Sequence, residues 1–209
     1  NAFIYFGSPA GWSERRHLRL PATRSTAVAA GDFNGDGRPD LAFLSQEQVR
    51  IFLQSEIGFE SKRYLETGIG GEQIGACDLD ADGCSELVVR DADGAMRIYW
   101  GSSAGLNFAN PTPIPIPLDE AEADDTDASD RSSAEFVQEA KPLVQFITLA
   151  GRPHVFVARN ACSWLVPVHP NRQFGPSLRF DCTAAIGVGQ GDLRGRGATD
   201  LVFACRPRS

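Results

Sequence analysis

Two short stretches of the sequence carry oxygen-bearing side chains at alternate positions, with one more after a gap. These residues are Asp32, Asn34, Asp36 and Asp40 in the first stretch, and Asp78, Asp80, Asp82 and Glu86 in the second. Calcium takes six to eight oxygen ligands at about 2.3–2.6 Å, and alternate side chains of a curled loop can direct oxygens to one centre. Gly37 and Gly83 permit the sharp turn. The carbonyl of Arg38 or Cys84 would fill a further position, so the spacing predicts two calcium sites.

The alternative for both stretches is a metal-free hairpin turn rich in Asp and Gly. Such a turn would hold several carboxylates close together without a counter-charge, which is unfavourable. Two further copies of the stretch have lost the ligands. One has Arg194 and Arg196 at ligand positions, and we expect an ion pair with Asp192 or Asp200 in place of the metal. The other has His154 at the last ligand position.

The four copies follow a regular period. Their central glycines, Gly37, Gly83, Gly151 and Gly197, are 46, 68 and 46 residues apart. The long gap contains an acidic insert of about 22 residues. Short β-rich runs recur within each period, separated by Gly, Asp, Asn and Pro, at 27–30, 40–44, 49–53 and 61–66, and again at 74–77, 86–90, 96–100 and 112–116. Four short strands per repeat predict an all-β propeller made of four-stranded antiparallel blades.

A turn after the third strand also recurs, as Tyr5-Phe-Gly-Ser-Pro-Ala-Gly-Trp12 and Tyr99-Trp-Gly-Ser-Ser-Ala-Gly-Leu106. With the Asp-rich loops, this turn makes the chain resemble the FG-GAP/VCBS repeat family, which includes the integrin-α-like β-propellers. The resemblance covers the whole chain apart from the acidic insert. It implies a secreted or cell-surface propeller stabilised by structural calcium, which acts as a protein-interaction or adhesion module and is not an enzyme.

The period divides the chain into parts. The parts are a half blade at 1–22, blades at 26–68 and 73–117, an acidic disordered insert at 118–140, a blade at 141–183 and a half blade at 184–206. The two half blades supply complementary strands, so we expect the chain ends to complete a fourth blade together, which would remove two open sheet edges. A fragment of a larger ring, or a ring shared by two chains, is the alternative.

The charge of the chain is concentrated in one segment. The net charge is −7, and residues 119–139 hold nine acidic residues and one basic one, so this segment contributes −8 and the remainder +1. No basic surface for nucleic acid is therefore expected. No apolar run approaches the roughly 18 residues of a membrane-spanning helix.

Other candidate sites are weaker. Ser103 lies in a Gly-x-Ser-x-Gly match, but a nucleophile elbow needs a following helix, and residues 106–113 are unsuited to one. Trp12, Trp100 and Trp164 would be the stacking residues of a carbohydrate-binding, lectin-like propeller, which is the main alternative function. An accessory propeller of a polysaccharide-active enzyme is a further one.

Five cysteines suggest disulfides in an oxidising compartment. Folding residues 163–182 into a hairpin places Cys162 opposite Cys182, which predicts a bond between them. Cys77 and Cys84 flank the second Asp-rich loop and form a second candidate pair, which leaves Cys205 over.

Overall fold

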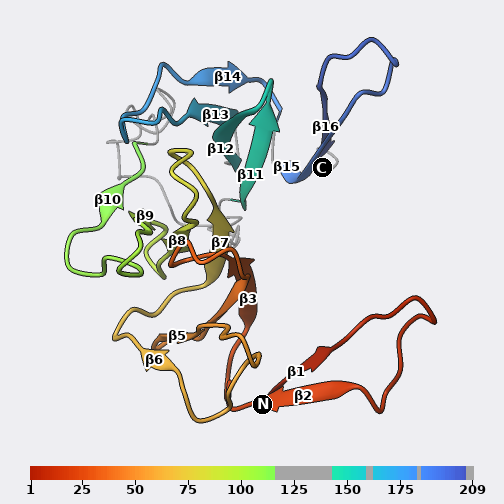
Figure 1. Cartoon of the computed structure of the whole chain (residues 1–209). Helices are drawn as coiled ribbons and strands as arrows, with labels where there is room; N and C mark the ends of the chain where they lie inside the picture. The colour runs from red at the N-terminus through yellow and green to blue at the C-terminus, as the bar shows by residue number, and fades with distance from the viewer. Residues whose placement is uncertain (116–142, 159–161, 183–184, 206–209) are drawn as a thin grey trace, which may run out of the picture. The chain divides into compact units, whose positions relative to one another are not determined.

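The computed structural model describes residues 1–115, 143–158, 162–182 and 185–205 (Figure 1). The predicted acidic insert at 118–140 therefore lies outside the described residues. The chain forms two compact units, Asn1–Ile114 and Pro115–Ser209. The described residues of both units form strands and turns, without a helix. None of them belongs to a helix that is long and apolar enough to cross a membrane.

The first unit contains one two-stranded antiparallel sheet and two four-stranded antiparallel sheets. The hairpin consists of β1 (Ala2–Tyr5) and β2 (His17–Leu20). The next sheet consists of β3 (Ala27–Gly31), β4 (Asp40–Leu44), β5 (Val49–Phe52) and β6 (Leu65–Glu66). The third consists of β7 (Gln73–Cys77), β8 (Glu86–Arg90), β9 (Met96–Tyr99) and β10 (Thr112–Pro113). In both larger sheets, strands that are neighbours in sequence pair with each other, as in a propeller blade.

The second unit repeats this arrangement. Its four-stranded sheet consists of β11 (Leu143–Leu149), β12 (Arg152–Ala158), β13 (Ser163–Pro167) and β14 (Leu178–Phe180). Its hairpin consists of β15 (Ala185–Gly191) and β16 (Asp200–Cys205). The four-stranded sheets confirm the predicted all-β fold of antiparallel blades. The union of β1–β2 with β15–β16 in one blade stays a prediction.

The outermost strands are shorter than predicted. β6 and β10 have two residues each, whereas the sequence suggested runs at 61–66 and 112–116. Each pairs on one side only, so fewer backbone hydrogen bonds hold it extended. The central strand β8, by contrast, is buried at every position from Glu86 to Arg90.

Sheet faces pack on one another within each unit. In the first unit Ala29, Ala42 and Ile51 of the β3–β6 sheet share a buried cluster with Leu87 and Val89 of β8. Leu20 of β2 shares another with Phe43 and Phe52, so the β1–β2 hairpin packs on the β3–β6 sheet. In the second unit Val188, Leu201 and Phe203 of the β15–β16 hairpin pack against a cluster that contains Phe156 and Leu165. Burial of these faces is the main stabilising contribution to such sheets.

One turn recurs after β1, β5 and β9. Its bounds are Ser8–Gly11, Ser55–Gly58 and Ser102–Gly105, and successive copies are 47 residues apart. In each, the glycine N–H donates to the serine carbonyl and the serine hydroxyl to the glycine carbonyl. Each glycine has a positive φ, between 89° and 97°, which favours glycine. Ser103 lies inside the third copy, and the residues after it are not helical.

The third blade has replaced its Asp-rich loop by a tight turn. Leu149 of β11 pairs with Arg152 of β12, which leaves Ala150 and Gly151 as the two turn residues. Both have positive φ, 49° and 75°, as a type I′ hairpin turn requires. His154 lies within β12 and pairs with Ile147, whereas the corresponding Asp40 is the first residue of its strand and directly follows the loop.

Both predicted cysteine pairs are wrong. Cys182 is bonded to Cys205, while Cys77 and Cys84 are free cysteines. Ser163 pairs with Phe180 across β13 and β14, which sets Cys162 opposite Asp181 and not opposite Cys182. A shift of one residue turns a side chain to the other face of a sheet. The Cys182 side chain accordingly packs with the cluster that also contains Phe203.

Candidate metal centre

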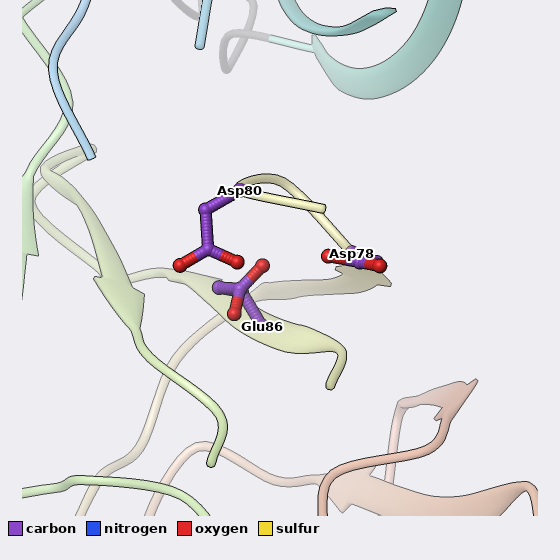
Figure 2. A group of neighbouring side chains, drawn as sticks. All are labelled: Asp78, Asp80 and Glu86. Carbon is purple, nitrogen blue, oxygen red and sulfur yellow. The ribbon is translucent and has the colours of Figure 1, made fainter. Parts of the chain in front are cut away.

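Three acidic side chains of the second Asp-rich loop converge. One carboxylate oxygen from each of Asp78, Asp80 and Glu86 lies within 4.8 Å of the other two. Asp78 and Asp80 belong to the loop after β7, and Glu86 begins β8; Figure 2 shows the carboxylates of Asp80 and Glu86 turned toward each other. Among the described residues this is the one group of three such side chains that could hold a metal ion.

Burial makes this group unfavourable without a cation. Asp80 is 5% exposed and Glu86 is 0% exposed. Burial, together with the charges of Asp80 and Asp78, raises the pKa of Glu86 to about 7. The Oδ1 atom of Asp78 is buried and has no hydrogen-bond partner. A buried acceptor without a partner costs free energy, so the donor set and its unsatisfied oxygen fit a hard divalent cation.

Backbone N–H groups hold the loop in its curl. Leu79 N donates to Glu86 Oε2 at 2.5 Å, and Gly83 N donates to Asp78 Oδ2 at 3.1 Å. Gly101 N, from the turn after β9, donates to Glu86 Oε1 at 3.3 Å. The buried Leu79 side chain anchors the loop. Glu86 therefore joins the loop between the first two strands to the turn after the third.

The first Asp-rich loop has the same backbone arrangement. Gly37 N donates to Asp32 Oδ2 at 2.7 Å, as Gly83 N does to Asp78. Phe33 N and Gln54 N donate to the two oxygens of Asp40 at 2.9 and 2.8 Å. Asp40 therefore has the same two kinds of donor as Glu86. Sequence reasoning missed the N–H groups of Gln54 and Gly101 as donors, although these residues follow Asp32 and Asp78 at nearly equal spacings of 22 and 23 residues.

The side chains of the first loop differ from those of the second. Arg38 was predicted to offer its carbonyl, but its guanidinium Nη2 lies 2.8 Å from Asp36 Oδ2. Asn34 Nδ2 also donates to Asp36 Oδ2, at 3.1 Å. Asp32, Asp36 and Asp40 do not form a group as tight as the one in the second loop. The Arg38 guanidinium therefore partly neutralises the negative charge of the first loop.

In the second loop, the two other predicted ligands lie beside the convergent group. The Asp82 carboxylate accepts the N–H of Cys84 at 2.8 Å, as Asp36 accepts that of Arg38 at 2.9 Å. This contact curls the backbone segment whose carbonyl was predicted as a ligand. The structure therefore brings Asp78, Asp80 and Glu86 together in a group that does not include Asp82.

The arginine-substituted loop confirms the expected ion pair. Arg194 pairs with Asp200, and its Nε lies 3.2 Å from Asp200 Oδ2. The N–H groups of Arg196 and Gly197 donate to Asp192 and lower the pKa of that carboxyl. The loop thus keeps the backbone hydrogen bonds of the first loop, and an arginine pairs with the carboxylate at the last predicted ligand position.

The three tryptophans differ in exposure. Trp100 is 5% exposed, and its Nε1 donates to Thr112 Oγ1 at 2.7 Å, which makes it a core residue. Trp164 is partly buried, and the guanidinium of Arg179 lies 5.8 Å from the centre of its ring. Trp12, on the β1–β2 hairpin, is 76% exposed and is the one free to stack on a ligand.

Comparison with known proteins agrees with this architecture. The family model of the FG-GAP-like repeat matches residues 32–89, which include both Asp-rich loops. No curated relative matches the chain. The crystal structure of BBS1N in complex with ARL6DN, soaked with mercury, has a TM-score of 0.53 and 18% identity, and the match covers 97% of this chain and 55% of that one. The crystal structure of the same complex soaked with lead has a TM-score of 0.53 and 16% identity, and the match covers 97% of this chain and 55% of that one.

This chain therefore spans about half the length of BBS1N. The Photorhabdus luminescens Tc holotoxin pore matches at a TM-score of 0.43 and 16% identity over 97% of this chain and 10% of that one, which is too low to support an inference. The sheets, the recurring loops and the repeat match lead to one conclusion: the chain has a β-propeller-type fold of four-stranded blades, and its residues 32–89 match the FG-GAP-like repeat.

Proposed function

We propose that this chain is a calcium-stabilised propeller module that binds a protein partner outside the cell and catalyses no reaction. The observation that carries the metal assignment is the convergence of Asp78, Asp80 and Glu86, with Asp78 Oδ1 buried and unsatisfied. Oxygen ligands of this kind suit calcium, whose coordination is flexible and rich in carboxylates.

The residues predicted as ligands would hold the ion in each loop. In the second loop these are Asp78, Asp80, Asp82, Glu86 and the Cys84 carbonyl. In the first they are Asp32, Asn34, Asp36, Asp40 and the Arg38 carbonyl. Bound calcium would supply the positive charge that the buried carboxylates lack. In the first loop Asp36 must leave the Arg38 guanidinium before it can bind an ion, so we expect the second loop to bind more tightly.

One observation supports an extracellular location, and a second supports binding to a protein partner. The Cys182–Cys205 disulfide is typical of proteins from oxidising compartments. BBS1N, a protein of similar fold, was crystallised in complex with ARL6DN. Exposed apolar residues at hairpin tips, Trp12 at 76% and Ile57 at 85%, are candidates for contact with a partner.

Calcium stoichiometry tests the metal assignment. Equilibrium dialysis followed by elemental analysis is expected to find two calcium ions per chain, and one after Asp80→Ala, which leaves no oxygen ligand at this position. Arg194→Asn with Arg196→Asp restores the ligand pattern of the first loop and is expected to add a third ion. Arg194→Lys keeps the cation and should leave the count at two. A folded wild-type chain that retains no calcium would contradict the proposal.

A glycan array separates the protein-binding from the lectin-like function. Trp12 is the tryptophan to replace, because it is the only one free to stack on a sugar. In the presence of calcium, we expect the wild-type chain to bind no sugar that Trp12→Ala fails to bind. Ile57→Ala, which removes an equally exposed apolar side chain, is the matched control. Reproducible binding of one sugar class that Trp12→Ala abolishes and Ile57→Ala leaves intact would favour the lectin.

A further inference from the structure

The two Asp-rich loops contact each other through the backbone. Ser85 N, one residue before Glu86, donates to the carbonyl oxygen of Asp32 at 2.6 Å. The bond joins a residue next to the last ligand of the second loop to the first ligand residue of the first loop. The contact lies within one compact unit, so both loops belong to the same packed body.

Side chains of the second loop fill spaces that glycines leave open in the first. A Cβ added at Gly31 would lie 2.7 Å from Ser85 Cβ, and one at Gly35 would lie 2.9 Å from Cys84 Sγ. Behind this pair, a Cβ at Gly101 would lie 2.5 Å from the carbonyl oxygen of Ser85. The Cys84–Ser85 segment is therefore held between the first loop and the turn after β9. A segment packed this closely cannot move without moving its neighbours.

We infer that the Cys84–Ser85 segment couples the two loops, so that calcium in the second loop strengthens calcium binding in the first. This inference rests on the proposed function. Without an ion, repulsion among Asp78, Asp80 and Glu86 opposes the closed form of the second loop. An ion in that loop fixes the segment, and the segment then fixes Asp32 through the Ser85 hydrogen bond.

The opposing effect is repulsion between two bound cations. Salt screens this repulsion over about 8 Å at physiological ionic strength, whereas packed contacts and a backbone hydrogen bond depend much less on salt. A coupling carried by a few such contacts is typically 5- to 150-fold. One hydrogen bond and two close contacts place this coupling at about tenfold, near the lower end of that range. By linkage, the first loop must strengthen the second by the same factor.

The repeat provides a matched pair of variants. Gly31→Ala places a methyl group against Ser85, and the φ of Gly31 is not in the left-handed region, so the change separates the loops without backbone strain. Gly191→Ala makes the same change at the equivalent position of the arginine-substituted loop, where nothing lies within 4 Å of the added Cβ. Neither glycine supplies a proposed ligand.

Calorimetric titration of the full chain with calcium, at 0.15 M and 1 M salt, tests the coupling. The affinity of the first loop is measured with the second loop intact and with it disabled by Asp80→Ala, which removes a ligand oxygen. We expect a loss of about tenfold on Asp80→Ala, nearly independent of salt. In the Gly31→Ala background the loss should fall to less than twofold, whereas Gly191→Ala should retain it.

The outcomes separate the coupling from the proposed function. If the wild-type chain binds no calcium, the proposed function fails and the coupling fails with it. If two ions bind and Asp80→Ala leaves the first-loop affinity unchanged or raises it, calcium binding stands and the coupling is overturned. An equal loss in the Gly31→Ala and wild-type backgrounds would also overturn it. Circular dichroism of each variant confirms that it is folded. If Asp80→Ala is unfolded, the coupling still requires that Gly31→Ala alone weakens calcium binding in the first loop and that Gly191→Ala does not.

Discussion

Calcium at a hundred times its dissociation constant is expected to raise the Tm of this chain by about 10–20 °C over the Tm in EDTA. Each site that binds only the folded state adds about 2.7 kcal/mol at that concentration, and two sites add about 5 kcal/mol. For a domain of this size each kcal/mol shifts the Tm by about 2–4 °C. Differential scanning calorimetry with stepwise addition of calcium measures the effect.

The Asp80→Ala variant provides an internal control with an opposite sign. In EDTA it should melt higher than the wild type, because it removes one of three convergent carboxylates, two of which are buried. In calcium it should melt lower, because the second loop has lost a ligand. Magnesium, which is smaller and keeps its water, should stabilise the wild type much less. A wild-type melting curve that is identical in EDTA and calcium would rule out a stabilising metal.

A disulfide between positions 4 and 202 is expected to form and to stabilise the chain by about 5 kcal/mol. The change is Ile4→Cys with Val202→Cys, and the bond would close a loop of about 200 residues. Each terminal hairpin buries one face and exposes apolar residues on the other. Phe3 and Tyr5 of β1 are about half exposed, as are Ile186 and Val202 of the β15–β16 hairpin.

The pairing of β9 with β8 in a complete blade gives the register expected between β1 and β16. Leu87 of β8 pairs with Tyr99 of β9, and Val88 pairs with Ile98. The repeat aligns Val88 with Val202 and Ile98 with Ile4, which gives the cysteine pair. In this register the exposed Phe3 and Tyr5 would share a face with Leu201 and Phe203, which are already packed against a core cluster. Closure would therefore cover the apolar side chains that each hairpin leaves exposed.

Non-reducing peptide mapping and melting with and without reductant detect the bond. Phe3→Cys with Val202→Cys is the control, because it is one residue out of register. A bond between two chains would indicate a ring shared by a dimer, and no bond would contradict closure. Deletion of residues 1–20 would be a weaker test of whether the two terminal hairpins form one blade. Leu20 packs on Phe43 and Phe52 within its own unit, so the deletion would destabilise that unit whether or not the ends meet.

The loops and blades were predictable because their residues repeat. Asp32 and Asp78 recur 46 residues apart, and the backbone donors around them recur as well. The ion pair of Arg194 with Asp200 was predictable because an arginine stands at a ligand position beside a retained carboxylate.

Side-chain choices and register were harder to predict. Nothing in the spacing shows that the Arg38 side chain folds back on Asp36 instead of extending into solvent. The Cys182–Cys205 bond depends on a hairpin register that the loop between β13 and β14 sets, and a sequence pattern cannot fix a register to one residue. The contact of Ser85 with Gly31 lies between two repeats, whereas periodicity describes only what occurs within each one.

The same disulfide has a mechanical consequence. Tension applied to the chain beyond Cys205 passes through the sulfur bridge to Cys182, which follows β14. The hydrogen bonds between β15 and β16 lie in parallel with that covalent path and carry little of the load. A pull on this end would therefore be resisted first by the β13–β14 pairing, with the β15–β16 hairpin shielded until a reductant opens the bridge.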